Sequence, residues 1–235
     1  MAKIIINADD FGISDQFDEA ILDLIKKDCL RSTSVIISGE VNLDHAKKLK
    51  QLAQSKKVSI GLHFIHEKHP NEKKITTDNH KLIQQKLEEQ YKNFIKFFQT
   101  NPSHLDKHNW DQNGVERRLM CEFAIEKNIP LRLHRENGFF YETKYQYQIK
   151  LADRQYNLSS KKYGLKAIKK DINELKNNDD VCEVISHPGF YDHRYDGTKF
   201  GTDLNKNREQ DYKKVIRLNN FLRKNGINIS SFLDF

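Results

Sequence analysis

Short apolar runs alternate along the chain with longer stretches in which apolar residues recur every three or four positions. The short runs predict β-strands, and the longer stretches predict helices with one apolar face. Strands are expected at 4–6, 31–38, 58–63, 104–106, 130–133, 181–186 and 227–232. Helices are expected at 17–25, 43–53, 83–98, 115–124, 165–175 and 212–222. This alternation predicts an α/β fold built on a parallel sheet.

Seven strands within 235 residues favour a closed or nearly closed barrel in a single domain spanning 1–235. A doubly wound open sheet is the alternative, although no Gly-x-Gly-x-x-Gly string follows the first strand to support nucleotide binding. Three segments show neither the helical nor the strand pattern and are expected to be long loops, at 64–79, 136–163 and 188–206.

Composition narrows the class of protein. The 40 Lys and Arg against 33 acids give a net charge of +7, but the basic residues are spread in pairs, mostly on the expected helices. A solvated outer face explains them, so nucleic-acid binding is not expected. The three cysteines form no Cys-x-x-Cys pair, which argues against disulfides, and Cys182 is expected in the core. Without a signal peptide or a run of ~20 apolar residues, we expect a cytoplasmic protein that does not contact membranes.

Polar clusters stand where four of the expected strands end. Asp9 and Asp10 follow the first strand, His63 ends the third, His104 to His108 surround the fourth, and His187 follows the strand at 181–186. Adjacent carboxylates repel each other unless a cation lies between them or one is protonated. A solvated turn that caps the next helix is the alternative for the two aspartates. Because the carboxyl ends of parallel strands meet at one edge, the clusters are expected to form one site.

One carboxylate and two imidazoles can bind a divalent metal ion, and here Asp10, His63 and His108 supply them. Imidazole favours zinc, nickel or cobalt over calcium, with magnesium left open. Asp9 would then stand beside a metal-bound water as its base. His187, followed by Pro188, is expected to protonate a leaving group as general acid.

Other polar residues have expected roles around this centre. His104 and Asp106 alternate with Leu105, so they share a face of the strand with His108. Asp106 is expected to orient a ligand histidine, with direct metal binding as the alternative. Arg132 is a further candidate for substrate binding or for support of the site. The remaining histidines are expected to be surface or satisfied core residues: His45, His66, His69, His80, His134 and His193.

Several strings resemble the motifs of the YdjC-like carbohydrate deacetylases, in the same order. They are Asn-Ala-Asp-Asp-Phe-Gly at 7–12, Arg-Ser-Thr-Ser at 31–34, Gly-Leu-His at 61–63, Pro-Ser-His-Leu-Asp-Lys-His at 102–108 and Ser-His-Pro-Gly at 186–189. The resemblance implies a distorted (β/α) TIM-like barrel with about seven parallel strands. It also implies metal-dependent removal of an acetyl group from an N-acetylated sugar. By position, Asp10, His63 and His108 match the metal ligands, Asp9 the base and His187 the histidine of the last motif.

The chain departs from that family after His108. The family usually continues with a histidine-rich string, whereas this chain reads Asn109-Trp110-Asp111-Gln112. Trp110 is expected either to stack on a sugar or to block the pocket, so this stretch bears on substrate choice and on activity. The lysine-rich loop after His63 also differs from the family, and its charge suggests an anionic substrate.

The sequence therefore predicts a metal-dependent hydrolase that deacetylates an N-acetylated sugar or oligosaccharide with metal-bound water as nucleophile. Its expected cofactor is one divalent metal ion, with zinc preferred over magnesium, nickel and cobalt, and its expected partner is a small carbohydrate substrate. A homodimer is left open. The rival hypotheses are a metal-dependent phosphoesterase and a catalytically altered family member that only binds sugar.

Overall fold

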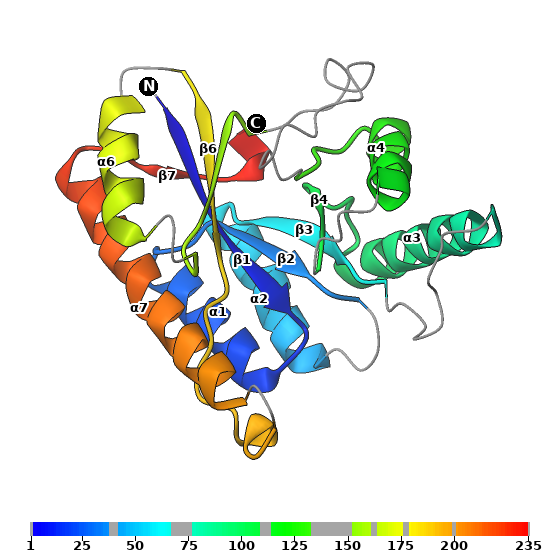
Figure 1. Ribbon diagram of the computed structural model, residues 1–235, viewed down its shortest axis with the longest axis horizontal. Helices are drawn as coiled ribbons and strands as arrows, with labels where there is room; N and C mark the ends of the chain where they lie inside the picture. Colours follow the sequence, from blue (N-terminus) through cyan, green and yellow to red (C-terminus); the bar gives the residue numbers. More distant parts are fainter. Residues whose placement is uncertain are drawn as a thin grey trace.

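The computed structural model describes residues 2–37, 42–66, 77–108, 114–132, 152–160, 164–175, 179–198 and 201–234. Every strand pairing in this part of the chain is parallel, in the order β4-β3-β2-β1-β6-β5, with β7 also pairing with β1. The sheet curls into a half-barrel with helices around it (Figure 1). The strands are β1 (Lys3–Phe11), β2 (Ser32–Val35), β3 (Ser59–Phe64), β4 (Leu105–Lys107), β5 (Arg154–Asn157), β6 (Val181–Ser186) and β7 (Ile229–Ser230). The predicted barrel-like α/β class is confirmed.

Helices connect these strands and cover the sheet. They are α1 (Asp15–Lys26), α2 (Leu43–Lys56), α3 (Thr77–Phe98), α4 (Gly114–Lys127), α6 (Leu165–Leu175) and α7 (Gly201–Lys224), with 3-10 turns η1 (His193–Tyr195) and η2 (Phe232–Asp234). The pair α3 and α4 lies toward the β4 end of the sheet, and α6 packs beside α7 toward the β5 end (Figure 1). None of the described helices has an apolar stretch long enough to span a bilayer.

The first strand is the centre of the fold. Ile4, Ile5 and Ile6 are fully buried, and β1 pairs with β2, β6 and β7. The strand extends five residues past the apolar run, through both aspartates to Phe11. Its register shifts between Ala8 and Phe11, and Asp10 has a φ of 73°. Neighbouring side chains of a regular strand point to opposite faces, so this irregularity allows Asp9 and Asp10 to line the same pocket.

Four element predictions were wrong. The strand expected at 130–133 is reduced to a bridge between Leu131 and Leu105, with 133 outside the described residues. The segment expected to lack order at 136–163 contains β5, whose polar Arg-Gln-Tyr-Asn sequence carries no apolar signal. The expected loop at 188–206 contains η1 and the first turn of α7. The loop expected at 64–79 is also shorter, because Phe64 ends β3 and α3 begins at Thr77.

The core agrees with the predicted apolar faces. The stripe of α3 is buried at Ile83, Leu87, Tyr91, Phe94 and Phe98. Cys182 is fully buried on β6, as predicted, and the three cysteines are free. Burial of apolar surface contributes roughly 25 cal/mol per Å² to the free energy of folding. The buried helix faces therefore stabilise the sheet whose strand ends carry the polar residues.

Gly61 on β3 makes room for a buried imidazole. A Cβ atom there would lie 2.3 Å from Nε2 of His104. That ring is stacked on Phe232 with centroids 3.9 Å apart, and its two nitrogens lie 2.9 Å from the hydroxyls of Ser34 and Ser103. The imidazole therefore cannot move aside without losing these contacts.

We predict that Gly61→Ala lowers the free energy of unfolding by about 1–3 kcal/mol, the usual cost of overpacking a core. Urea unfolding measures it. Gly164→Ala is the matched control, because a Cβ at Gly164 would meet nothing within 4 Å. Equal unfolding midpoints for the two variants would contradict the tight fit.

Candidate metal centre and its pocket

A pocket of about 620 Å³ opens at the carboxyl ends of the strands. Residues on or next to β1, β3, β4, β5 and β6 line the pocket and provide its polar side chains. Residues of α7 and η1 complete the wall. The sequence-predicted residues that line it are Asp9, Asp10, His63, His108 and His187. Four polar clusters from distant parts of the chain therefore meet in one cavity.

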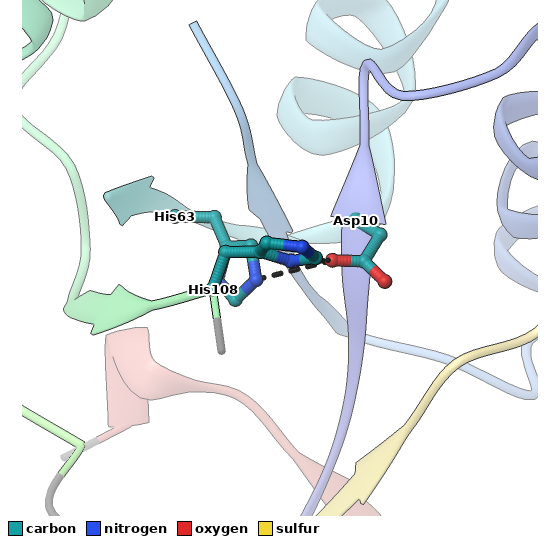
Figure 2. A group of neighbouring side chains, drawn as sticks. All are labelled: Asp10, His63 and His108. Atoms are coloured by element: carbon teal, nitrogen blue, oxygen red, sulfur yellow. Dashed lines mark hydrogen bonds and ion pairs between the residues drawn. The ribbon is translucent and has the colours of Figure 1, made fainter. Parts of the chain in front are cut away.

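Asp10, His63 and His108 point toward one another from β1, β3 and the residue after β4 (Figure 2). Oδ1 of Asp10 lies 2.8 Å from Nδ1 of His108 and 3.2 Å from Nε2 of His63. The three ligand atoms lie within 4.8 Å of one another. One carboxylate oxygen facing two ring nitrogens is a donor set that fits zinc, cobalt or nickel.

The electrostatics of this cluster favour a bound cation. Burial raises the pKa of Asp10, but the hydrogen bonds from His108 and His63 and the charge of Arg208 hold it well below its usual value. Burial lowers the pKa of His63, but the carboxylates of Asp106 and Asp9 raise it to about 10. The surroundings thus supply negative charge that stabilises a positive charge at this position, which a metal ion can provide in place of a proton.

Asp106 lies behind the histidine rather than beside the pocket opening. Its Oδ1 is 2.5 Å from Nδ1 of His63, and its Oδ2 accepts a hydrogen bond from Ser34. A carboxylate on the far nitrogen fixes the ring orientation and leaves Nε2 free to bind a metal. A second group of ligand atoms, from Asp9, His63 and Asp106, is also close enough to hold an ion. We favour the first group because Arg132 already contacts both carboxylates of the second.

Arg132 joins the buried carboxylates of the site. Its Nη1 lies 2.7 Å from Oδ2 of Asp9 and 2.9 Å from Oδ2 of Asp106, and its Nε donates to Glu183 at 2.6 Å. Burial lowers the pKa of Arg132, but the three acids hold it well above its usual value. Asp9 also accepts a hydrogen bond from Asn7 at 2.7 Å. The carboxylate proposed as base is therefore fixed at both oxygens.

We predict that Arg132→Leu destabilises the protein by about 3–5 kcal/mol, because removing one member of a buried ion-pair network leaves uncompensated charges. Arg154→Leu on β5 is the control, since its side chain is 49% exposed and an exposed ion pair is worth about 1 kcal/mol or less. Chemical denaturation compares the two. A loss below about 1 kcal/mol in Arg132→Leu would contradict the network's stabilising role.

His187 also lies near the carboxylate of Asp9. Its Nε2 lies 3.8 Å from Oδ2 of Asp9, and its side chain is 30% exposed. Its backbone N–H donates to Asp211 of α7, which also accepts a hydrogen bond from Ser159. The backbone of His187 is thus fixed to α7, and its partly exposed imidazole lines the pocket.

Comparison with known proteins identifies the chain's relatives. The model of the YdjC-like protein family matches residues 3–217. The chain belongs to the YdjC-like family. It is 27% identical to carbohydrate deacetylase 2 of Listeria innocua serovar 6a, over 99% of this chain and 98% of that protein. It is 28% identical to a chitooligosaccharide deacetylase of Escherichia fergusonii, over 58% of this chain and 61% of that protein.

Two solved structures have the same fold as this YdjC-like protein. A protein of Enterococcus faecalis V583 with an assumed role in cellobiose-phosphate cleavage superposes with a TM-score of 0.76 at 18% identity, covering 99% of this chain and 98% of that one. A peptidoglycan N-acetylglucosamine deacetylase, Bc1960, superposes with a TM-score of 0.54 at 15% identity, covering 97% and 85%. At these identities the likeness shows the fold.

Several residues of the YdjC-like site were not predicted. Arg208 of α7 contacts Oδ2 of Asp10 at 2.5 Å and lies 4.3 Å from the ring centroid of Phe17. It was missed because the polar start of α7 has no helical stripe. The sequence analysis also gave no role to Asn7 or Ser34, which are hydrogen-bonded to each other beside the site. Both residues lie within the motif strings at 7–12 and 31–34. Trp110, by contrast, was singled out and lies outside the described residues, as does the rest of 109–112.

His104 is a buried neutral histidine of the YdjC-like fold. Burial and the charge of Arg132 lower its pKa to about 3, against the opposing effect of Asp106. An unfolded chain binds a proton at this histidine below about pH 6.5, and the folded chain does not. The stability that His104 contributes is therefore present above about pH 6.5 and is lost as the pH falls toward 3.

We predict that the stability of the metal-free wild type relative to His104→Gln falls as the pH is lowered from 6.5 to 4.5. Burial raises the pKa of Asp18 and of Glu183 to about 7, so these acids change the stability in the opposite direction over this window, but they do so in both proteins. His63 does not interfere, because a raised pKa gives a contribution that is constant below about pH 6.5. Urea unfolding at several pH values gives the slopes. The same slope in both proteins would contradict the assignment of a neutral His104.

Proposed function

We propose that this protein is a metal-dependent carbohydrate N-deacetylase that hydrolyses the acetamide of an N-acetylated sugar. The observation that carries the proposal is the juxtaposition of Asp10, His63 and His108 with Asp9 and His187 in one pocket. A metal-ligand set, a second carboxylate and a partly exposed imidazole are the groups that amide hydrolysis needs. We further propose that residues 1–235 act as one domain.

The relatives support the reaction class. The two described above are named carbohydrate deacetylase and chitooligosaccharide deacetylase. A family 4 acetyl xylan esterase from Clostridium thermocellum, which superposes with a TM-score of 0.58 at 10% identity over 100% of this chain and 89% of that one, was solved with a cobalt ion. Our chain offers donors of the type that cobalt and zinc bind.

Each residue has a proposed part in the chemistry. Asp10, His63 and His108 would hold the ion, which when bound lowers the pKa of a coordinated water and polarises the acyl oxygen. Asp9, anchored by Arg132 and Asn7, would take a proton from the attacking water. His187, whose Nε2 lies 3.8 Å from Oδ2 of Asp9, would donate a proton to the departing amine nitrogen. Asp106 would keep Nε2 of His63 directed at the ion.

A substrate panel tests the proposal. Metal-loaded protein is incubated with N-acetylglucosamine, chito-oligosaccharides, a 6-phosphorylated N-acetylated sugar and a phosphate ester, and acetate and phosphate are both measured. We expect acetate from at least one N-acetylated sugar and no phosphate. Phosphate alone would select the phosphoesterase hypothesis, and sugar binding with neither product would select a family member that only binds sugar. Faster turnover of neutral than of phosphorylated sugars would rule out the preference for anionic substrates.

A further inference from the structure

A second cluster of metal-ligating side chains lies where α1 and α2 begin. Asp15 and Asp18 belong to the first turns of α1, and His45 belongs to the first turn of α2. His45 is only 6% exposed and Asp18 only 1%. The sequence predicted a surface or satisfied core histidine at position 45. The structure contradicts that expectation, because Nδ1 of His45 is buried without a hydrogen-bond partner among the described residues.

The unpartnered nitrogen points at two carboxylates. Nδ1 of His45 lies 3.5 Å from Oδ2 of Asp18 and 3.7 Å from Oδ1 of Asp15. Both distances exceed the roughly 2.7–3.2 Å of an N–H···O hydrogen bond. A protonated imidazole between two acids would donate to one of them at hydrogen-bond distance. The observed spacing instead leaves a gap that three ligand atoms surround.

That spacing suits a metal ion. Ligand atoms about 2.0–2.2 Å from a tetrahedral zinc ion lie roughly 3.3–3.6 Å from one another. The three atoms here lie within 4.8 Å of one another, and the two nitrogen–oxygen distances are close to the tetrahedral value. The side chain of Asp15 is 60% exposed, so an ion could enter from solvent and keep a water as its fourth ligand.

Neighbouring contacts hold the two carboxylates in place. The backbone N–H of Gly12 donates to Oδ1 of Asp18 at 2.7 Å, which leaves Oδ2 facing His45. The side-chain amide of Asn42 donates to Asp15 at 2.8 Å. Ligating carboxylates in proteins are commonly fixed by such outer hydrogen bonds.

We propose that Asp15, Asp18 and His45 bind a divalent transition-metal ion of the zinc or cobalt class, at a site separate from the pocket ligands. Such an ion joins the start of α1 to the start of α2. Through Asp18 and Gly12 it also fixes the turn that follows Asp9 and Asp10. Its role is structural, and it does not depend on the reaction that the pocket catalyses.

Counting bound metal tests the proposal. Chelated full-length protein is titrated with cobalt chloride or zinc sulfate, and binding is followed by calorimetry and elemental analysis. We expect about two equivalents per chain in the wild type, about one in His45→Gln, about one in His63→Ala, and none in the double variant. His193→Gln is the matched control, since the side chain of His193 is 88% exposed, and it should keep both equivalents.

A second readout excludes a folding artefact. Metal added to His63→Ala should raise its melting temperature, because an ion that binds only the folded state stabilises it. The same addition should not stabilise the double variant. If His45→Gln does not fold, Asp15→Asn at the exposed ligand replaces it. One equivalent in the wild type that His63→Ala abolishes, two equivalents in His45→Gln, or second-site binding only at millimolar metal would each overturn the proposal.

Discussion

Asp9→Asn is expected to lower kcat by about 10²–10⁴-fold, the usual contribution of a general base, while the pocket keeps its metal. An asparagine has nearly the same shape, and its one carbonyl oxygen can still accept a hydrogen bond from Arg132 or from Asn7, but it cannot take a proton from water. Acetate release gives kcat, and elemental analysis gives the metal content.

The control for this variant is Asp203→Asn, at an exposed position in the first turn of α7. It removes one carboxylate outside the pocket and should leave kcat within a factor of about two, because surface substitutions usually have small effects. Undiminished turnover in Asp9→Asn would remove Asp9 from the role of base. Loss of metal from that variant would instead mean that Asp9 is a ligand.

His63→Ala is expected to weaken metal binding in the pocket by more than about 100-fold, since loss of a mere orienting partner already costs about 10–100-fold. The variant removes one of three ligands and leaves Asp106 without the imidazole that it contacts at 2.5 Å. Turnover should fall with the metal and should not be restored by micromolar zinc.

The variant His187→Ala tests whether His187 acts as a general acid or as a metal ligand. It is expected to keep the pocket metal and to lose kcat, because His187 contributes no atom to the ligand group of Asp10, His63 and His108. Titration with cobalt measures the metal affinity of His63→Ala and of His187→Ala. Equal metal affinity in His63→Ala and in the wild type would contradict the ligand assignment, and metal loss in His187→Ala would extend the ligand set.

The sequence predicted the fold and the meeting of the strand ends because both follow from local patterns. β-branched runs predict buried strands, and the carboxyl ends of parallel strands meet at one edge. The irregularity at Asp10, which brings two adjacent aspartates into one pocket, has no such pattern and appears only in the register between β1 and β2. Strand β5 was missed because a polar strand gives no apolar signal.

Residues that complete the site from elsewhere in the chain were harder to predict. Arg208 contacts Asp10 from a helix whose first turns are polar, and nothing near it in the sequence marks it as part of the pocket. The same is true of His45, which was indistinguishable from other isolated histidines until α1 and α2 were packed together. Contacts between side chains that are distant in sequence depend on helix placement, which periodicity alone does not give.

The most direct test of the central claim is acetate release from chito-oligosaccharides by chelated protein as zinc or cobalt is returned in small steps. We expect no acetate from the chelated protein and a rise in activity that ends when the pocket ligands Asp10, His63 and His108 are saturated. The His45→Gln variant, which keeps the pocket, should follow the same course with about one equivalent per chain. Full activity in protein shown by elemental analysis to hold no metal would contradict the account.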